Sequence, residues 1–164
     1  MRRRTVLVTG IAVVAAIAAA GTLATGAGSI CDDLQRSIDE SVSGFATIEH
    51  ELIDGAANEW STTFVIRGAS DCSLTRDVKR ASYQCEWEYE LGDTAARTAL
   101  AAMTNEVASC LGQSSSRGDD SVNHPDFFAA QYFEIDHGQV SVSLKDKNAL
   151  AKTYVTVGVD RITG

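Results

Sequence analysis

The sequence lacks the short motifs that identify most enzyme and cofactor sites. It has no Gly-x-Ser-x-Gly nucleophile elbow, no His-x-His or His-Glu-x-x-His zinc spacing and no Cys-x-x-Cys pair. It also has no Asn-x-Ser/Thr acceptor for N-glycosylation. The sequence therefore has none of the usual signatures of serine hydrolases with that elbow, of zinc peptidases or of thioredoxin-like enzymes. We expect neither a cofactor nor a metal site.

Acidic residues are missing from the N-terminal segment, where no Asp or Glu precedes Asp32. Residues 1–28 instead contain three arginines, an apolar run over 6–20 and then small residues. That order is typical of a secretory signal peptide, so residues 1–28 are predicted to direct the chain to a secreted or periplasmic location. The alternative is an uncleaved membrane anchor, because the apolar stretch approaches the roughly 20 residues that span a bilayer.

The charge balance is strongly acidic. The chain has 14 Lys and Arg against 22 Asp and Glu. Loss of residues 1–28 would leave 11 against 22, a formal charge of −11. Phosphate backbones and anionic lipid surfaces repel such a chain, which excludes nucleic acid and a membrane surface as partners and favours a basic protein or peptide.

Four cysteines are present in a chain that is expected to be exported, which predicts two disulfides. Cys31 begins the first expected helix and Cys110 ends the second, so two antiparallel helices would bring them together. Cys72 and Cys85 flank an expected hairpin turn. Of the three possible connectivities, we therefore favour Cys31 to Cys110 with Cys72 to Cys85.

Two helices are predicted from apolar residues that recur at intervals of three and four. The first follows an N-cap at Ser29 and stops at Gly44. Its apolar stripe consists of Cys31, Leu34, Ile38, Val42 and Phe45. The second follows Asp93 and ends before Gly112.

The clearest strand runs from Tyr83 to Leu91, where apolar and polar side chains alternate. Its aromatic side is predicted to face the core and its glutamates to face outward. The other expected strands are 46–52, 60–66, 72–75, 132–135, 140–144 and 154–162.

The order helix, strands, helix, strands predicts a single α+β domain over residues 29–164. We expect an antiparallel sheet of about four to five strands, with the two helices packed on one face. Residues 113–123 are rich in Ser, Gly and Asp and are predicted to form a mobile loop.

Two groups of residues are candidates for binding. Glu86, Glu88 and Glu90 share one strand face, which is either simply solvated or a docking surface for a basic partner. Phe127, Phe128 and Tyr132 follow the expected loop and would form a binding lip if they stay exposed.

These features favour an exported, non-enzymatic binding domain that recognises a protein or peptide, as an inhibitor or immunity-type module would. Two alternatives stay open. One is a small extracytoplasmic hydrolase built on scattered carboxylates and one histidine. The other is a membrane-tethered envelope or sensory domain, which requires that residues 1–28 are not cleaved.

Overall fold

The computed structural model describes residues 29–117 and 128–162, so the expected signal segment 1–28 lies outside the described residues. The helices are α1 (Ile30–Ser41), α2 (Thr94–Leu111) and the short 3-10 helix η1 (Asn148–Leu150). The strands are β1 (Glu49–Leu52), β2 (Glu59–Thr62), β3 (Asp71–Arg76), β4 (Arg80–Glu90), β5 (Ser116–Arg117), β6 (Phe128–Ile135), β7 (Gly138–Lys147) and β8 (Lys152–Ile162).

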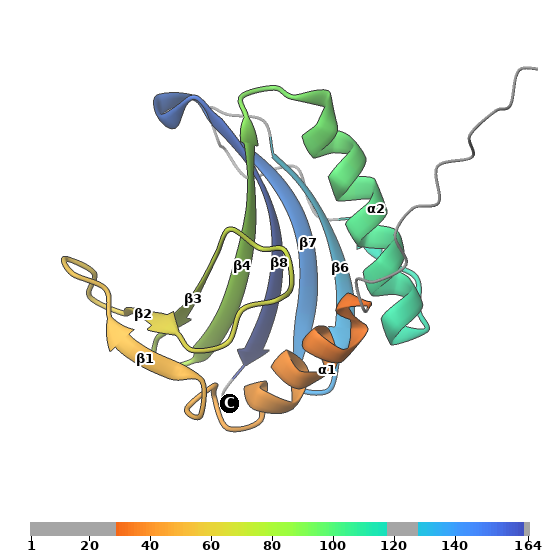
Figure 1. Cartoon of the computed structure of the whole chain (residues 1–164). Helices are drawn as coiled ribbons and strands as arrows, with labels where there is room; N and C mark the ends of the chain where they lie inside the picture. The colour runs from red at the N-terminus through yellow and green to blue at the C-terminus, as the bar shows by residue number, and fades with distance from the viewer. Residues whose placement is uncertain (1–28, 118–127, 163–164) are drawn as a thin grey trace, which may run out of the picture.

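All eight strands form one antiparallel sheet in the order β1-β2-β3-β4-β8-β7-β6-β5 (Figure 1). The predicted number of four to five strands is therefore wrong. Strands β1 and β2 overlap the expected strands 46–52 and 60–66 but have only four residues each, whereas the two-residue strand β5 was not expected. Strand β5 occupies two of residues 113–123, which were predicted to be a loop, and it pairs with β6. Residues 118–123 of that predicted loop lie outside the described residues.

Pairing between β4 and β8 joins the strands that precede α2 to the strands that follow it. The register runs without a break through eleven pairs, from Arg80 opposite Ile162 to Glu90 opposite Lys152. Strand β8 then pairs with β7 through ten further residues. The two strands at the centre of the sheet are thus contributed by opposite halves of the chain.

One face of this sheet, the inner face, is packed against both helices (Figure 1). Helix α1 contacts β4 and β8, and α2 contacts β7 and β8. The inner face of the central strands is almost fully buried and consists of aliphatic side chains, a tyrosine and a cysteine. These residues are Tyr83, Cys85, Val140, Val142, Val157 and Val159.

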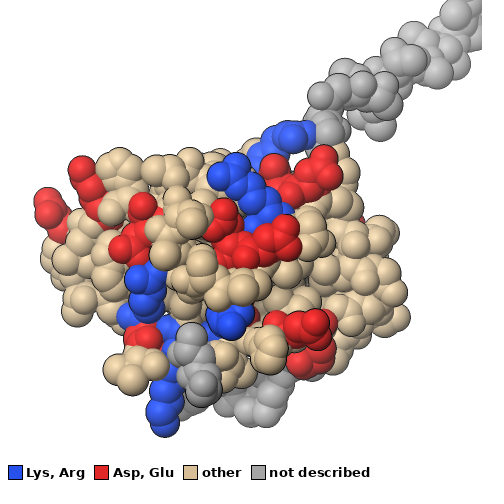
Figure 2. Space-filling view, turned by 90° about the horizontal axis from the view of Figure 1, so that it is seen from below, with Lys and Arg blue, Asp and Glu red and all other residues tan. Residues whose placement is uncertain are grey.

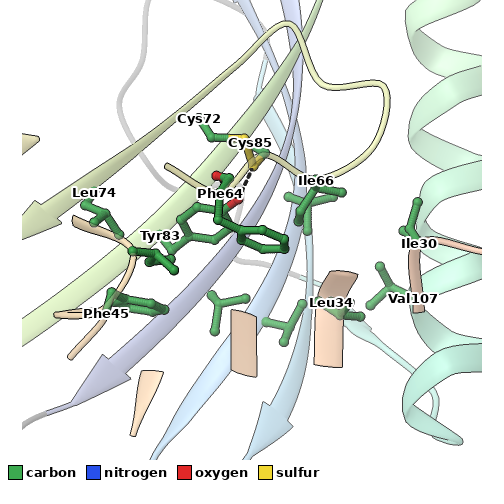
Figure 3. Close-up of a cluster of buried hydrophobic side chains, with 14 of the residues drawn as sticks. Ile30, Leu34, Phe45, Phe64, Ile66, Cys72, Leu74, Tyr83, Cys85 and Val107 are labelled. Atoms are coloured by element: carbon green, nitrogen blue, oxygen red, sulfur yellow. Dashed lines mark hydrogen bonds between the residues drawn. A yellow bond between two sulfur atoms is a disulfide. The ribbon is translucent and has the colours of Figure 1, made fainter. Parts of the chain in front are cut away.

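The segment from 63 to 70 also covers the inner face, although 60–66 was predicted to be a strand. Strand β2 ends at Thr62, and Phe64 and Ile66 then point into the core, where they are 7% and 0% exposed. The Tyr83 hydroxyl donates a hydrogen bond of 3.0 Å to the Phe64 carbonyl, which holds this segment over the sheet (Figure 3). The free energy gained by burying these two large side chains here exceeds what continued strand pairing would contribute.

Both helices begin at the predicted caps. The Ser29 side chain accepts a hydrogen bond at the start of α1, and Asp93 accepts one at 2.8 Å from the Ala95 amide. Helix α1 ends three residues earlier than expected, so Val42 leaves the apolar stripe and is 69% exposed. The backbone turns with positive φ at Gly44 and Phe45, which brings the Phe45 ring into the core.

The two disulfides confirm the predicted pairing. Cys31 is bonded to Cys110, which ties the start of α1 to the end of α2. Cys72 is bonded to Cys85, its direct partner across β3 and β4. Two disulfides indicate an oxidising, extracytoplasmic environment. Among the described residues, no helix combines the length and the apolar character needed to cross a bilayer.

The strand from Tyr83 to Leu91 has the predicted register, with one difference at its end. Tyr83, Trp87 and Tyr89 face the core or its margin, and the glutamates face the other way. Strand β4 ends at Glu90, so Leu91 lies in the following turn and is 41% exposed.

Two glycines of the central strands predict opposite responses to substitution. A Cβ atom on Gly138 would lie 1.9 Å from the Asp160 carbonyl oxygen, which belongs to the backbone of the neighbouring strand. Gly138→Ala should therefore lower the free energy of unfolding by about 3 kcal/mol or more. A Cβ on Gly158 would meet the Ser141 Oγ at 2.8 Å, and this side chain can rotate away. Gly158→Ala should cost less than about 1 kcal/mol.

Urea unfolding of the two variants measures this difference, and the double variant Gly158→Ala with Ser141→Ala is the control that removes the clashing hydroxyl. Equal losses for Gly138→Ala and Gly158→Ala would show that the β7–β8 register is not the one described.

Candidate functional site

The other side of the sheet, here called the open face, is not covered by any described helix (Figure 1). Cross-strand register places its side chains in rows over β6, β7, β8 and β4. One row consists of Phe128, Lys145, Tyr154 and Glu88. The next two rows consist of Ala130, Ser143, Thr156 and Glu86, and of Tyr132, Ser141, Gly158 and Gln84.

Small side chains in the middle rows leave a hollow at the centre of the open face. This central hollow has a volume of about 330 Å³, and its floor includes Ser141, Ser143 and Thr156. Gly158 adds no side chain between Ser141 and Gln84. The size falls at the lower end of the range for small-ligand sites in proteins.

Three half-exposed aromatic rings stand around the central hollow: Phe128, Tyr132 and Tyr154. Phe128 and Tyr132 belong to the predicted binding lip, whereas Phe127 lies outside the described residues. The neighbouring Phe133 points the other way and is buried in the core. Tyr154 had no predicted role, although the alternation of β8 already placed it on the polar side of that strand.

The predicted acidic strand face is partly neutralised by its neighbour β8. Lys152 Nζ lies 2.7 Å from a carboxylate oxygen of Glu90 and 3.0 Å from one of Glu88. Hydrogen bonds to Glu90 and then to Glu88 raise the pKa of Lys152 above its usual value. Burial raises the pKa of Tyr154, and the Glu88 carboxylate raises it further. Of the three predicted glutamates, Glu86 alone forms no ion pair with a described residue.

The buried carboxylate of Asp160 holds the Arg80 side chain at the rim of the central hollow. Asp160 is 5% exposed and accepts hydrogen bonds from the Ser82 hydroxyl, from the Gln139 amide at 3.1 Å and from the Arg80 guanidinium at 2.5 Å. These three donors satisfy most of the hydrogen-bonding capacity of the carboxylate, and its contact with the guanidinium fixes Arg80 at the rim.

A second hollow adjoins the first over β3 and β4. This acidic hollow has a volume of about 310 Å³, and its carboxylates are Glu59, Asp71 and Glu86. Asp71 and Glu86 are direct partners across the two strands. Gln84, Glu86 and Lys147 line both hollows, which makes them one continuous depression.

Charge elsewhere is mixed. Seen from below, the molecule has basic and acidic side chains close together rather than a surface of one sign (Figure 2). The ion pair of 2.7 Å between Arg76 and Glu49 and the pair between Arg80 and Asp160 are examples of this mixing. On the face seen in Figure 2, the acidic composition therefore does not produce a uniformly acidic surface.

The two described histidines are not gathered at the open face. His50 lies on β1, His137 lies in the turn between β6 and β7, and His124 is outside the described residues. Neither described histidine lines the central or the acidic hollow. In the described ranges, no group of three or more metal-ligating side chains comes together.

Comparison with known proteins assigns this chain to no family. No family model matches it, and no curated protein or solved structure is similar enough to count as a match. Its function must therefore be inferred from the open face and the hollows themselves.

The pairing of Lys152 predicts a specific dependence of stability on pH. Since its pKa is raised in the folded protein, Lys152 stabilises the fold below its unfolded pKa of about 10.4, and this stabilisation is lost as pH rises further. The double variant Glu88→Gln and Glu90→Gln lacks both partners. Its deficit in unfolding free energy relative to the wild type should narrow between about pH 8 and pH 12.

Denaturant unfolding at several pH values measures this deficit. The buried Tyr83, whose pKa is also raised, is present in both proteins and cancels in the comparison. Tyr154 does not cancel, because Glu88 raises its pKa, so both proteins are compared in a Tyr154→Phe background. A deficit that stays constant up to pH 12 would show that Lys152 does not depend on these carboxylates.

Proposed function

We propose that this protein is an exported, non-enzymatic binding domain that takes up a polypeptide segment on the open face of its sheet. The observation that carries the proposal is the central hollow, which lies on the one face that no described helix covers. The covered face provides the core, which leaves the open face available for recognition.

A solvated face is common in antiparallel sheets, so exposure alone is not an argument for binding. Two features distinguish this face from a merely solvated one. Its centre is hollowed by small side chains where long charged ones would suit solvent equally well. Its margin also presents three half-exposed aromatic rings, the residue class that is enriched where proteins bind one another.

The groups in the central hollow match the chemistry of a polypeptide. Ser141, Ser143, Thr156 and Gln84 offer hydroxyl and amide groups that both donate and accept hydrogen bonds, as backbone amides require. The aromatic rings offer apolar contact to side chains. A segment held this way is bound without any covalent step.

Export is supported by two independent features. Residues 1–28 have the composition of a signal peptide, and all four cysteines of the chain are paired in disulfides. The membrane-tethered alternative differs only in whether residues 1–28 are cleaved, and it would leave the binding surface unchanged.

A variant that fills the hollow tests this proposal. Ser143→Trp should block the floor of the central hollow, whereas Ser109→Trp adds the same side chain on the exposed side of α2. Short random peptides displayed in a library and enriched on the purified full chain should keep their affinity for Ser109→Trp. They should bind Ser143→Trp at least about tenfold more weakly, a loss of about 1.4 kcal/mol.

Thermal unfolding shows whether both variants are folded before binding is compared. Enriched peptides that bind Ser143→Trp and the wild type equally well would mean that the hollow is not the binding site. A Gly158→Ala variant, which fills the same hollow by one methyl group, keeps the test decisive if Ser143→Trp does not fold.

A further inference from the structure

The open face is divided by charge along the order of its strands. Its acidic part lies over β3 and β4, where Asp71 and Glu86 face the acidic hollow. Its basic part lies over β7, where Lys145 and Lys147 line the central hollow. Lys147 also reaches the acidic hollow, whereas Lys145 lines the central hollow alone, two strands away from Glu86.

The acidic part contains two carboxylates that form no ion pair with a described residue, although Lys147 lines the same hollow. Asp71 and Glu86 are direct cross-strand partners, and like charges in that position destabilise a sheet. The neighbouring Lys152 forms its ion pairs with Glu88 and Glu90 instead. A cationic group placed between the two carboxylates would relieve their repulsion.

The basic part is similarly unneutralised. Lys145 is half-buried, has Phe128 and Tyr154 as its direct neighbours across the strands, and pairs with no carboxylate in the described part of the chain. Lys147 Nζ lies 4.4 Å from the centre of the Tyr154 ring, so its charge is directed over an aromatic surface. An anionic group would be attracted to this side.

We propose that the open face recognises an extended polypeptide segment that carries a basic and an acidic side chain about four residues apart. The basic side chain lies over Asp71 and Glu86, and the acidic one lies at Lys145. This inference rests on the proposed function and adds the chemistry of the segment. It also refines the expectation of a simply basic partner, because the basic part of the face would repel such a partner.

Strand geometry gives the spacing. Glu86 on β4 is aligned with Ser143 on β7, which lies two strands away, and Lys145 lies two residues beyond Ser143 along β7. With strands about 4.8 Å apart and a rise of about 3.3 Å per residue, their Cα atoms are separated by about 12 Å. In an extended peptide, residues four apart are separated by about 13 Å and point to the same side. Both charged side chains can therefore face the sheet together.

A second copy of this chain is the main competing occupant, because a face divided by charge is complementary to itself after rotation. That arrangement would place one central hollow opposite the other and leave a void, whereas protein interfaces pack densely. A narrow segment fills the depression without leaving a void. The segment is therefore the occupant that the geometry favours.

Blocked synthetic peptides test the required spacing by calorimetric titration of the purified full chain. The probe has one lysine and one glutamate four residues apart in a serine and valine background. Matched controls carry the same two residues side by side, or two lysines, or two glutamates. The spaced peptide should bind at least about tenfold more tightly than each control, which corresponds to about 1.4 kcal/mol.

Charge reversal on the protein tests the assigned residues. Glu86→Lys and Lys145→Glu should each weaken binding of the spaced peptide at least about fivefold, because each replaces a charge that attracts the peptide by one that repels it. The double variant should recover most of the affinity, since the inverted face accepts the same peptide in the opposite direction. Asp54→Lys and Lys79→Glu, which make the same charge changes at exposed turns, should change the affinity less than about twofold.

The outcomes separate this inference from the proposed function. Equal binding of spaced and adjacent-charge peptides, or no recovery in the double variant, overturns the charge pattern. If the enriched library peptides still lose affinity when Ser143→Trp fills the central hollow, the proposed function stands. A different outcome is that the full chain forms a dimer, which dissociates in Lys145→Glu and forms again in the double variant. That result would identify a second copy as the occupant and would overturn the proposal of a bound segment.

Discussion

The pairing of β4 with β8 is the contact on which the rest of the structure depends. It joins the two halves of the chain through eleven consecutive residue pairs. A shift of one residue would turn every side chain of one strand to the opposite face. Buried side chains such as Tyr83 on β4 and Val157 on β8 prevent that shift, because it would move them into water.

The same register determines the open face. With Val157 turned inward, its neighbours Thr156 and Gly158 turn outward and form part of the hollowed centre. Lys152 is placed opposite Glu90 by the same pairing and neutralises two of the strand glutamates. Core and recognition surface are therefore two consequences of one strand alignment.

Features that depend on local patterns could be predicted from the sequence. The caps and apolar repeat of α2, the alternation of β4 and both disulfides follow from residues that lie close together or that end a helix. The two-residue strand β5 and the inward path of Phe64 and Ile66 could not be predicted in this way, because packing against distant residues determines them.

The candidate site, too, could be predicted from the sequence only where local patterns determine it. Alternation along β4 already placed its glutamates outward, and Phe128 and Tyr132 were selected as an aromatic lip. That Lys152 pairs with Glu90 depends on a neighbour 62 residues away, which no local pattern reveals. The central hollow is likewise visible only when the strands are aligned, since its floor combines small residues from both β7 and β8.

Chemical-shift mapping of the isotope-labelled full chain during titration with a bound peptide locates the binding surface directly. If the open face is the recognition surface, the largest amide shifts should fall on β4, β7 and β8, at residues such as Gln84, Ser143 and Thr156. The exposed side of α2 should stay unchanged. Shifts concentrated on α1 and α2, with the central strands unaffected, would contradict the assignment of the open face as the binding surface.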